Sequence, residues 1–292
     1  MNTENQFAND LYCLSSAGFC VIPDFTPQKV VASLRRKADA WIKEVHVYEE
    51  MIGEPIGYGS SWPLENIRCL YAIDISFQEL AMASRMHAYA AAYLEEYEIG
   101  DVQVISNMPD ELNVCEGAEG KVDFHRDHGW RDDRSPPYSL HCFVPLTEMT
   151  CKNGATVVVP GSHRTREPCH PFQEVEPGER VDGNEHTVYQ RRLFPSSVSL
   201  EAPSGSLVLI DPMVIHSQGI NVTKEKRVVL NIAFKQPFLR GLLNCHGIAT
   251  RCARVDLSAN LLDHLVCNES LPGTCGPLGQ LLTGGKRGIC VE

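Results

Sequence analysis

The chain has 292 residues, of which 43% are hydrophobic and 22% charged, a composition typical of a globular protein with a large core. Its formal net charge is −11, and the sequence has no dense Lys/Arg cluster that could bind a phosphate backbone. We therefore expect no nucleic-acid partner. No stretch approaches the roughly 18 apolar residues that span a membrane, and the N-terminus lacks a secretory pattern. We therefore expect a cytoplasmic protein with no membrane partner.

Two amphipathic helices are predicted in the first hundred residues. Apolar residues recur with helical spacing over residues 27–45, which predicts one buried face. Ser76 and Glu79 have the spacing of a capping box and predict a second helix over residues 76–97 that ends before Gly100. The buried face of the first helix is expected to contain Val30, Val31, Leu34, Ala38, Trp41, Ile42 and Val45.

From residue 101 the pattern changes to short runs of β-forming residues separated by Gly- and Pro-containing turns. Several such strands without intervening helices favour a sandwich or barrel over a parallel sheet. Residues 165–190 are polar and rich in Pro and Gly, and are predicted to form a long loop over the strands. The strands are expected near residues 102–105, 112–115, 138–145, 155–159, 206–210 and 227–234.

No internal repeat or linker divides the chain, so we expect a single domain over residues 1–292. It would comprise a helical N-terminal part (about 1–100), a β core (about 101–240) and a C-terminal extension (about 241–292). The twelve cysteines are scattered, and no two of them form a Cys-x-x-Cys pair. Without a secretory signal, we interpret them as free thiols.

His125 and Asp127 form the first candidate site. Residues i and i+2 of a strand face the same side, so this pair presents an imidazole and a carboxylate together. That combination suits a divalent transition metal, although a polar pair on the protein surface would have the same sequence pattern. The His-Arg-Asp of a kinase catalytic loop is excluded by context, because Asp132 stands where that loop needs Asn and no phosphate-binding glycine loop precedes it.

His216 and Arg227 could complete this site. His216 follows an apolar strand interrupted by Asp211-Pro212, and taken alone it would be interpreted as a core histidine. Arg227 comes eleven residues later, after a polar turn. If the two residues lie on the arms of one hairpin, they face each other across it. A guanidinium buried beside a metal needs an anionic partner, and the carboxylate of a cosubstrate would supply one.

These residues, together with the segment 152–164 (Lys-Asn-Gly-Ala-Thr-Val-Val-Val-Pro-Gly-Ser-His-Arg), resemble the phytanoyl-CoA dioxygenase (PhyH) family. The resemblance covers about residues 10–240. It implies a mostly β fold, with a double-stranded β-helix (jelly-roll) core and flanking helices. It also implies a non-haem dioxygenase that uses Fe(II), 2-oxoglutarate and O2.

The resemblance also assigns the site residues. It implies that the catalytic iron is held by His125, Asp127 and His216. It implies contacts to 2-oxoglutarate from Arg227, Thr156, Phe143 and Asn107. Substrate contacts are expected from His128, Trp130, Arg131 and Arg134, which lie in or just after the metal motif. His163 is interpreted as part of a turn, and His141 is a candidate for a position near the site whose spacing does not fit a metal ligand.

The carboxylate of Asp127 bears on the reaction, because halogenases of this group have a small residue at that position. The resemblance therefore implies hydroxylation, or related desaturation, epoxidation or ring formation, with release of succinate and CO2. The expected substrate is a small molecule of specialised biosynthesis. An acyl-CoA hydroxylase, a non-catalytic jelly-roll binding module, and a cupin-type isomerase or hydrolase stay open as alternatives. The oligomeric state is not predicted.

Overall fold

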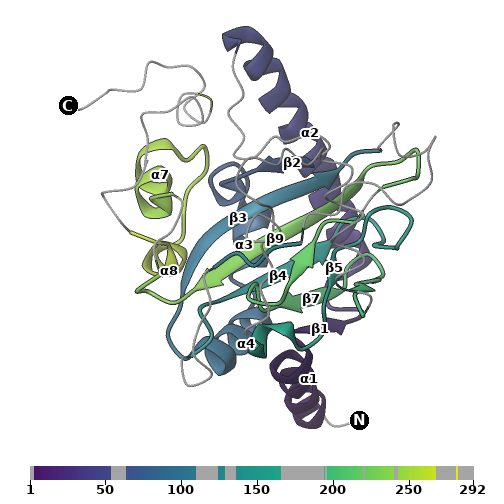
Figure 1. The fold of residues 1–292 in the computed structure, drawn as a ribbon. Coiled ribbons are helices and arrows are strands. Elements are labelled where there is room, and N and C mark those ends of the chain that lie inside the picture. The colour runs from purple at the N-terminus through teal and green to yellow at the C-terminus, as the bar shows by residue number, and fades with distance from the viewer. Residues whose placement is uncertain are drawn as a thin grey trace, which may run out of the picture. The chain divides into compact units, whose positions relative to one another are not determined.

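A computed structural model provides the fold (Figure 1), and it describes residues 3–53, 64–109, 124–128, 136–165, 194, 196–219, 221–239, 243–267 and 281. The helices are α1 (Thr3–Ala17), α2 (Gln28–Ile52), α3 (Ile75–Ala81), α4 (Ser84–Leu94), α7 (Cys245–Cys252) and α8 (Ala259–His264), with short 3-10 turns η1 (Leu70–Ala72) and η2 (Ser162–Arg164). The strands are β1 (Phe19–Ile22), β2 (Leu64–Ile67), β3 (Glu98–Asn107), β4 (Ser139–Pro145), β5 (Val157–Val158), β6 (Val198–Ser199), β7 (Leu207–Ile210), β8 (His216–Ser217) and β9 (Arg227–Lys235).

The strands form two sheets. The larger has six strands in the order β1-β7-β4-β9-β3-β2, and the smaller has three in the order β6-β5-β8. β1 runs antiparallel to β7, with Phe19 opposite Ile210, and β5 runs antiparallel to both of its neighbours. The prediction of a mostly β core with flanking helices is therefore confirmed.

The chain forms two compact units. The first comprises residues 1–26, 106–136 and 143–228, and the second comprises residues 27–105, 137–142 and 229–292. The first unit contains α1, β1 and β5 to β8, and the second contains the remaining helices, β2 and most of β3 and β9.

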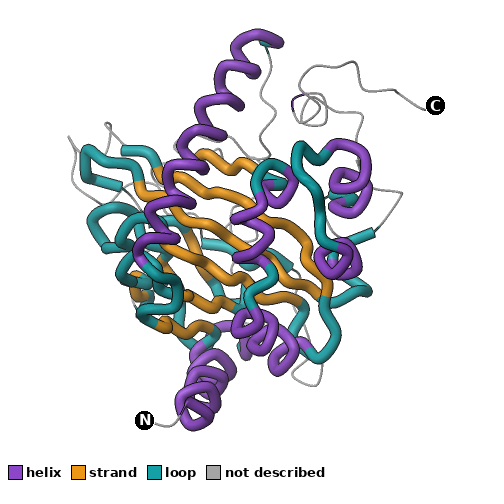
Figure 2. The backbone as a smooth tube through the Cα atoms, turned by 180° about the vertical axis from the view of Figure 1, so that it is seen from behind, coloured by secondary structure: helices purple, strands orange, loops and turns teal. Residues whose placement is uncertain are grey.

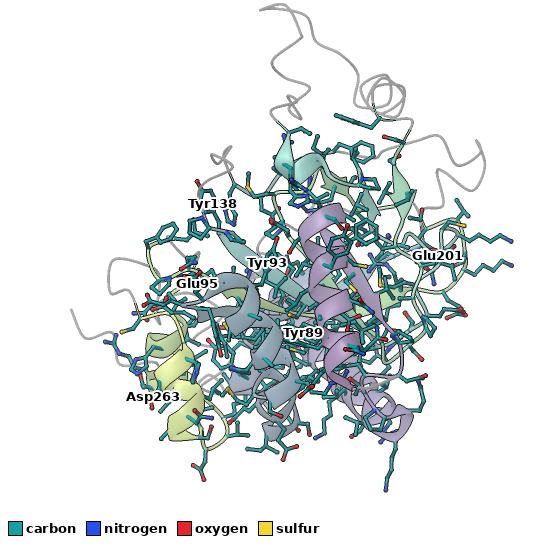
Figure 3. The ribbon with its side chains drawn as sticks, turned by 90° about the horizontal axis from the view of Figure 1, so that it is seen from below. Tyr89, Tyr93, Glu95, Tyr138, Glu201 and Asp263 are labelled. Atoms are coloured by element: carbon teal, nitrogen blue, oxygen red, sulfur yellow. The ribbon has the colours of Figure 1, made fainter. Side chains whose placement is uncertain are left out.

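In the second unit, α2 and α3 lie across one face of the strands (Figure 2). The periodicity of α2 was predicted correctly in six positions, since all expected core residues except Val30 are buried. On α4, Tyr89 and Tyr93 are buried whereas Glu95, just past the helix end, is exposed (Figure 3).

Two predictions about the first hundred residues are wrong. This part is not helical throughout, because it contains β1, β2 and the beginning of β3. The expected helix over 76–97 is two helices, α3 and α4, with a break at Met82 and Ala83. Asp74, not a Ser76–Glu79 box, caps α3 by accepting a hydrogen bond from the Ser76 amide at 2.8 Å. Gly100 lies inside β3, because pairing with neighbouring strands outweighs the weak strand preference of glycine.

Every cysteine in the described ranges is a free thiol. Among the helices that the structure describes, none combines the length and the apolar character needed to cross a membrane. The predicted strand at 112–115 and nearly all of the predicted loop at 165–190 lie outside the described residues.

Candidate metal and cosubstrate site

The main chain brings His125 and His216 together in the first unit. The His125 amide donates to the His216 carbonyl and the His216 amide donates to the His125 carbonyl, each at 2.9 Å. The Asp127 amide donates to the Pro212 carbonyl at 3.0 Å. Two segments about ninety residues apart in the sequence are thus paired as an antiparallel bridge at the site.

A cluster of apolar side chains supports the two histidines from behind. Phe124 and Ile215, the residues that precede them, are fully buried, and successive side chains of an extended segment point to opposite faces. When each apolar residue packs inward, the histidine after it must point to the other side. The cluster consists of Phe124, Val157, Val159, Phe194 and Ile215.

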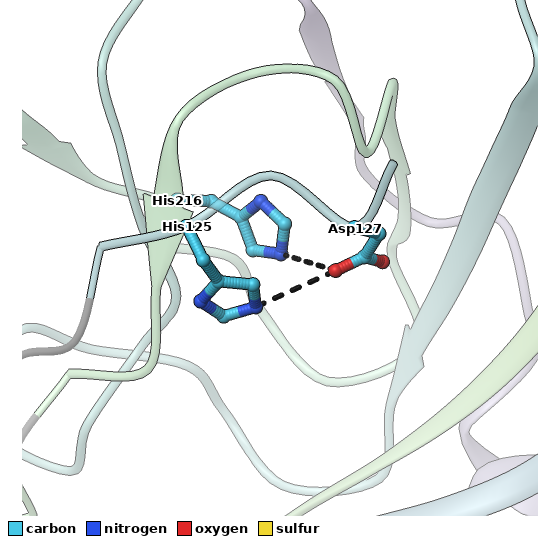
Figure 4. A group of neighbouring side chains, drawn as sticks. All are labelled: His125, Asp127 and His216. Carbon is cyan, nitrogen blue, oxygen red and sulfur yellow. Dashed lines mark ion pairs between the residues drawn. The ribbon is translucent and has the colours of Figure 1, made fainter. Parts of the chain in front are cut away.

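Three side chains converge on this other side (Figure 4). His125 Nε2 lies 3.4 Å from Asp127 Oδ1, and His216 Nε2 lies 3.5 Å from the same oxygen. One ligand atom from each residue falls within 4.8 Å of the others, so the group could hold a single metal ion. Ligands about 2.1 Å from one metal would lie roughly 3.0–3.4 Å apart in octahedral or tetrahedral geometry, which these spacings approach.

The protonation of His216 also fits a cation at this position. Its Nδ1 is 2.9 Å from the Val214 carbonyl, so Nδ1 carries the hydrogen. Burial lowers the pKa of His216, which favours the neutral ring, although Asp127 opposes this shift. The Nε2 lone pair therefore faces an anionic oxygen, and a cation between the two removes their repulsion.

Arg227, the first residue of β9, has a buried guanidinium with 2% of its surface exposed. Its Nε has no hydrogen-bond partner within the described ranges. Burial lowers the pKa of Arg227 to about 10, so the group stays charged at neutral pH. An internal charge of this kind requires an anion, and a carboxylate matches the planar fork of its donors.

Thr156 lies on the same face of the small sheet as His216. Val158 is directly opposite His216 in the β5–β8 pair, and Thr156 is two residues before Val158. Residues opposite each other and residues two apart share a face, so Thr156 is on the ligand side of this sheet.

The predicted hairpin between His216 and Arg227 is wrong. β8, which carries His216, pairs with β5 in the small sheet, whereas β9, which begins with Arg227, belongs to the large sheet. The chain crosses between sheets at this point, because each strand pairs with partners that are distant in the sequence.

Asn107 holds two loops together. Its Nδ2 donates to the Gly219 carbonyl at 2.8 Å and to the Gly154 carbonyl at 3.2 Å. Both amide hydrogens are therefore used, and the side chain offers a ligand only its Oδ1, which has no partner in the described chain. A contact between Asn107 and 2-oxoglutarate stays a prediction, and such a contact would have to use this acceptor.

Asn221 is a structural residue that the sequence analysis missed. Its Nδ2 donates to the carbonyls of Asn107 at 3.0 Å and Glu225 at 2.8 Å, and its Oδ1 accepts from the Thr223 amide at 3.0 Å. These bonds shape the turn that leads to Arg227. The Asn-x-Thr spelling was the available signal, since Asn side chains commonly accept from the amide two residues on.

Other predicted residues are placed as follows. Phe143 is half-buried on β4, and His128 is half-buried with a pKa that burial lowers. His163 is buried, and its Nε2 donates to the Ser15 carbonyl at 3.1 Å, which agrees with a structural role. His141 lies in the second unit, 3.0 Å from Asn231 Nδ2. Trp130, Arg131 and Arg134 lie outside the described residues.

Known proteins resemble this chain in sequence and in fold. Dioxygenase af480 of Aspergillus fumigatus is 28% identical over 178 residues, and ectoine dioxygenase of Halomonas elongata is 26% identical over 226 residues. These matches cover 59% and 72% of the chain, but only 50% and 64% of the two relatives' lengths.

The epimerase SnoN, solved with Fe3+, alpha ketoglutarate and nogalamycin RO, has a TM-score of 0.56 at 17% identity, covering 80% of this chain and 85% of SnoN. This likeness confirms the jelly-roll fold. The family description "Phytanoyl-CoA dioxygenase (PhyH)" matches residues 14–229, and the chain therefore belongs to the phytanoyl-CoA dioxygenase (PhyH) family.

Proposed function

We propose that the chain is an Fe(II)- and 2-oxoglutarate-dependent dioxygenase that hydroxylates an unactivated C–H bond of a small-molecule metabolite in specialised biosynthesis. We also propose that it works as one domain, because the family match crosses both units. Iron, 2-oxoglutarate and O2 are the cofactor set of the family. The observation that carries the proposal is the convergence of two imidazoles and one carboxylate in the unit that also contains the buried Arg227.

In this proposal, His125, Asp127 and His216 hold the iron from one side. A facial set of two histidines and one carboxylate leaves positions open for a cosubstrate and O2. Bound iron and 2-oxoglutarate supply an oxidising centre, with succinate and CO2 as by-products. The apolar cluster that includes Phe124 and Ile215 keeps water from the protein side of the site.

Arg227 and Thr156 bind the distal carboxylate of 2-oxoglutarate in this proposal. The desolvated fork of Arg227 gains a partner when the carboxylate binds, so the cosubstrate relieves the cost of burying the charge. His128, Trp130, Arg131 and Arg134 are the proposed substrate contacts.

Hydroxylation is the proposed outcome because Asp127 occupies the position that a halide would need. Desaturation, ring formation and epimerisation also begin with removal of a hydrogen atom, whereas epoxidation adds oxygen to a double bond. Analysis of the product distinguishes each of them from hydroxylation. A small polar substrate is favoured over an acyl-CoA by the net charge of −11, which disfavours a diphosphate group. A relative named for ectoine, a small molecule, supports the same class.

The test is an anaerobic titration of the iron-loaded protein with 2-oxoglutarate, followed by the weak visible charge-transfer band of a chelated 2-oxo acid. The wild type is compared with His216→Ala, Arg227→Lys and Arg164→Lys. Arg164 is exposed and serves as the matched control for an arginine-to-lysine change.

We expect the band in the wild type and in Arg164→Lys, and its loss in His216→Ala. Arg227→Lys should need about 10- to 100-fold more 2-oxoglutarate, since a hydrogen-bonded charge contributes about 1.5–3 kcal/mol and lysine lacks the fork. If the iron-loaded wild type gives no band, the chain is not a 2-oxoglutarate oxygenase, and the binding-module alternative is favoured.

A further inference from the structure

Arg126 lies between two of the proposed metal ligands, His125 and Asp127. On an extended segment its side chain points to the face opposite theirs, so it does not contribute a ligand atom. Its guanidinium nevertheless makes specific contacts with two other parts of the first unit. Those contacts involve the segments that position the third ligand.

The guanidinium donates to three backbone carbonyls. Nε donates to Met213 at 2.9 Å, and Nη2 donates to Ser162 at 2.6 Å and Thr165 at 3.2 Å. Met213 lies in the loop from Asp211 to His216. Ser162 is the first residue of η2, and Thr165 directly follows η2. Hydrogen bonds from a charged donor are stronger than neutral ones, and the rigid fork fixes direction as well as distance.

Ser162 closes this arrangement into a ring. Its Oγ accepts from the amide of Ile215 at 2.7 Å, and the Ile215 carbonyl accepts from the Val159 amide at 2.8 Å. Arg126 therefore ties the segment that carries His125 and Asp127 to the residues directly before His216. The three hydrogen bonds from Arg126 end on backbone carbonyls, and the Ser162 hydroxyl makes the remaining link to Ile215.

We propose that Arg126 is a positioning residue that holds the three metal ligands in register, an inference that rests on the proposed function. It acts through Met213 and Ser162 on the loop before His216, and through its own backbone on His125 and Asp127. Removing it should weaken metal binding, because outer contacts that orient ligands contribute about 10- to 100-fold to metal affinity.

Electrostatics alone predicts the opposite change in metal affinity. A positive charge near a divalent cation repels it, so removing the charge should tighten metal binding. Replacing Arg126 with Lys should change nothing if charge is all that matters. If geometry matters, Lys should weaken binding, because one ammonium group cannot reproduce a fork directed at separate carbonyls.

The experiment is a Co(II) titration of metal-free protein at neutral pH, followed by the visible d–d absorption of the bound ion. Wild type is compared with Arg126→Gln, Arg126→Lys and Arg164→Gln. Arg164 is exposed at the end of η2, the element that Arg126 contacts through Ser162. Arg164→Gln therefore removes an equal charge without removing a hydrogen bond of the ring. Thermal unfolding of each metal-free variant is measured in parallel.

We expect the Kd for Co(II) to rise about 10- to 100-fold in Arg126→Gln, and to rise also in Arg126→Lys, while Arg164→Gln matches the wild type. If Arg126→Gln does not fold, the Arg126→Lys titration decides in the same way. Tighter binding in Arg126→Gln, or a lower melting temperature with unchanged Co(II) affinity, overturns the inference alone. If the wild type binds no Co(II), the metal site of the proposed function fails as well.

Discussion

Gly154 shows how a single residue supports the candidate site. Its φ is +79°, in the region that side chains disfavour, and a Cβ at this position would collide with Nδ2 of Asn107. Asn107 donates to the Gly154 carbonyl, so the missing side chain is what permits the close approach. The glycine of the Asn-Gly-Ala-Thr sequence therefore meets a packing requirement two residues before Thr156.

Replacement of Gly154 with Ala should destabilise the protein more than replacement of Gly53. Gly53 also has a positive φ (+74°), but nothing lies near the position of its Cβ. Gly53→Ala should therefore lose about 1–2 kcal/mol from backbone strain alone. Gly154→Ala should lose about 1–3 kcal/mol more from the collision. Urea unfolding measures both changes.

A second variant tests the cause. Asn107→Ala removes the nearest group that the new Cβ would meet and leaves the Gly219 carbonyl oxygen, 2.7 Å from the position of that Cβ. The double variant Gly154→Ala/Asn107→Ala should therefore lose less stability than the sum of the single changes. Strict additivity would show that Asn107 is not responsible for the requirement for glycine.

The identities of the candidate metal ligands were predictable from short sequence patterns. The i, i+2 rule places His125 and Asp127 on one side, and the family motif adds His216, whose ligand atom does lie within 4.8 Å of theirs. The bonds of Asn107 and Arg126, and the bond from Asn221 to the Asn107 carbonyl, were not predictable, because each connects segments that only the folded chain brings together.

At the scale of elements, the break between α3 and α4 is the clearest departure from the sequence pattern. The start of α3 is held by Lys37 of α2, whose Nζ lies 2.6 Å from Asp74 Oδ1 and 2.5 Å from Ser76 Oγ. Across the break, His87 Nε2 of α4 donates to the carbonyl of Ala81, the last residue of α3, at 2.9 Å. Tertiary contacts thus end one helix and begin the next within a continuous apolar pattern.

His87 should make the stability of metal-free protein fall in acid. Burial lowers its pKa below the ordinary value of 6.5, and Tyr97 Oη lies 2.9 Å from its Nδ1. The folded state therefore binds fewer protons than the unfolded state. The stabilising contribution is present above pH 6.5 and is lost as pH falls from 6.5 through the lowered pKa.

His87→Gln tests this directly, because the glutamine amide can keep both hydrogen bonds but does not titrate. We expect the free energy of unfolding to fall less between about pH 7.5 and pH 5 in the variant than in the wild type, measured by urea unfolding. An equal decline in both proteins would assign the acid sensitivity to other groups.

At the scale of the whole chain, the C-terminal segment is integrated into the second unit. Tyr71 Oη donates to the Cys245 carbonyl at 3.1 Å, and the Arg254 amide donates to the Ala72 carbonyl at 2.7 Å. Ile99 of β3 forms a bridge with Leu265. The region expected as a C-terminal extension therefore includes two helices that contribute to a core.

Removal of the residues after 242 should abolish cooperative unfolding. It would expose the apolar surface that α7 and α8 cover, at about 1.5–3 kcal/mol for each large side chain, against a typical total of about 5–15 kcal/mol. Circular dichroism during urea unfolding checks this. The apolar residues lost include Ile248, Leu261, Leu265 and Val266.

Arg254→Ala is the matched point variant. Its guanidinium lies 4.9 Å from the Trp41 ring and 2.7 Å from Glu44, which is half-exposed. Partial exposure limits the loss to about 1–2 kcal/mol, so this variant should still unfold cooperatively. If the chain truncated after residue 242 is as stable as Arg254→Ala, the C-terminal segment is dispensable for folding.

The sequence by itself determined the features that depend on short-range periodicity. These are the β texture after residue 101, the buried face of α2 and the pairing of His125 with Asp127, each of which follows from residues two to four positions apart. The family motif extended this to iron and 2-oxoglutarate.

Only the tertiary structure decided which strands are neighbours. β8 and β9 are separated by nine residues yet belong to different sheets, whereas His125 pairs with His216 across about ninety residues. Strand pairing, the Asn107 and Arg126 bonds and the docking of α7 and α8 all join distant parts of the chain. The free energy of each of these interactions depends on all the segments that meet in the folded chain, and no local sequence pattern contains that information.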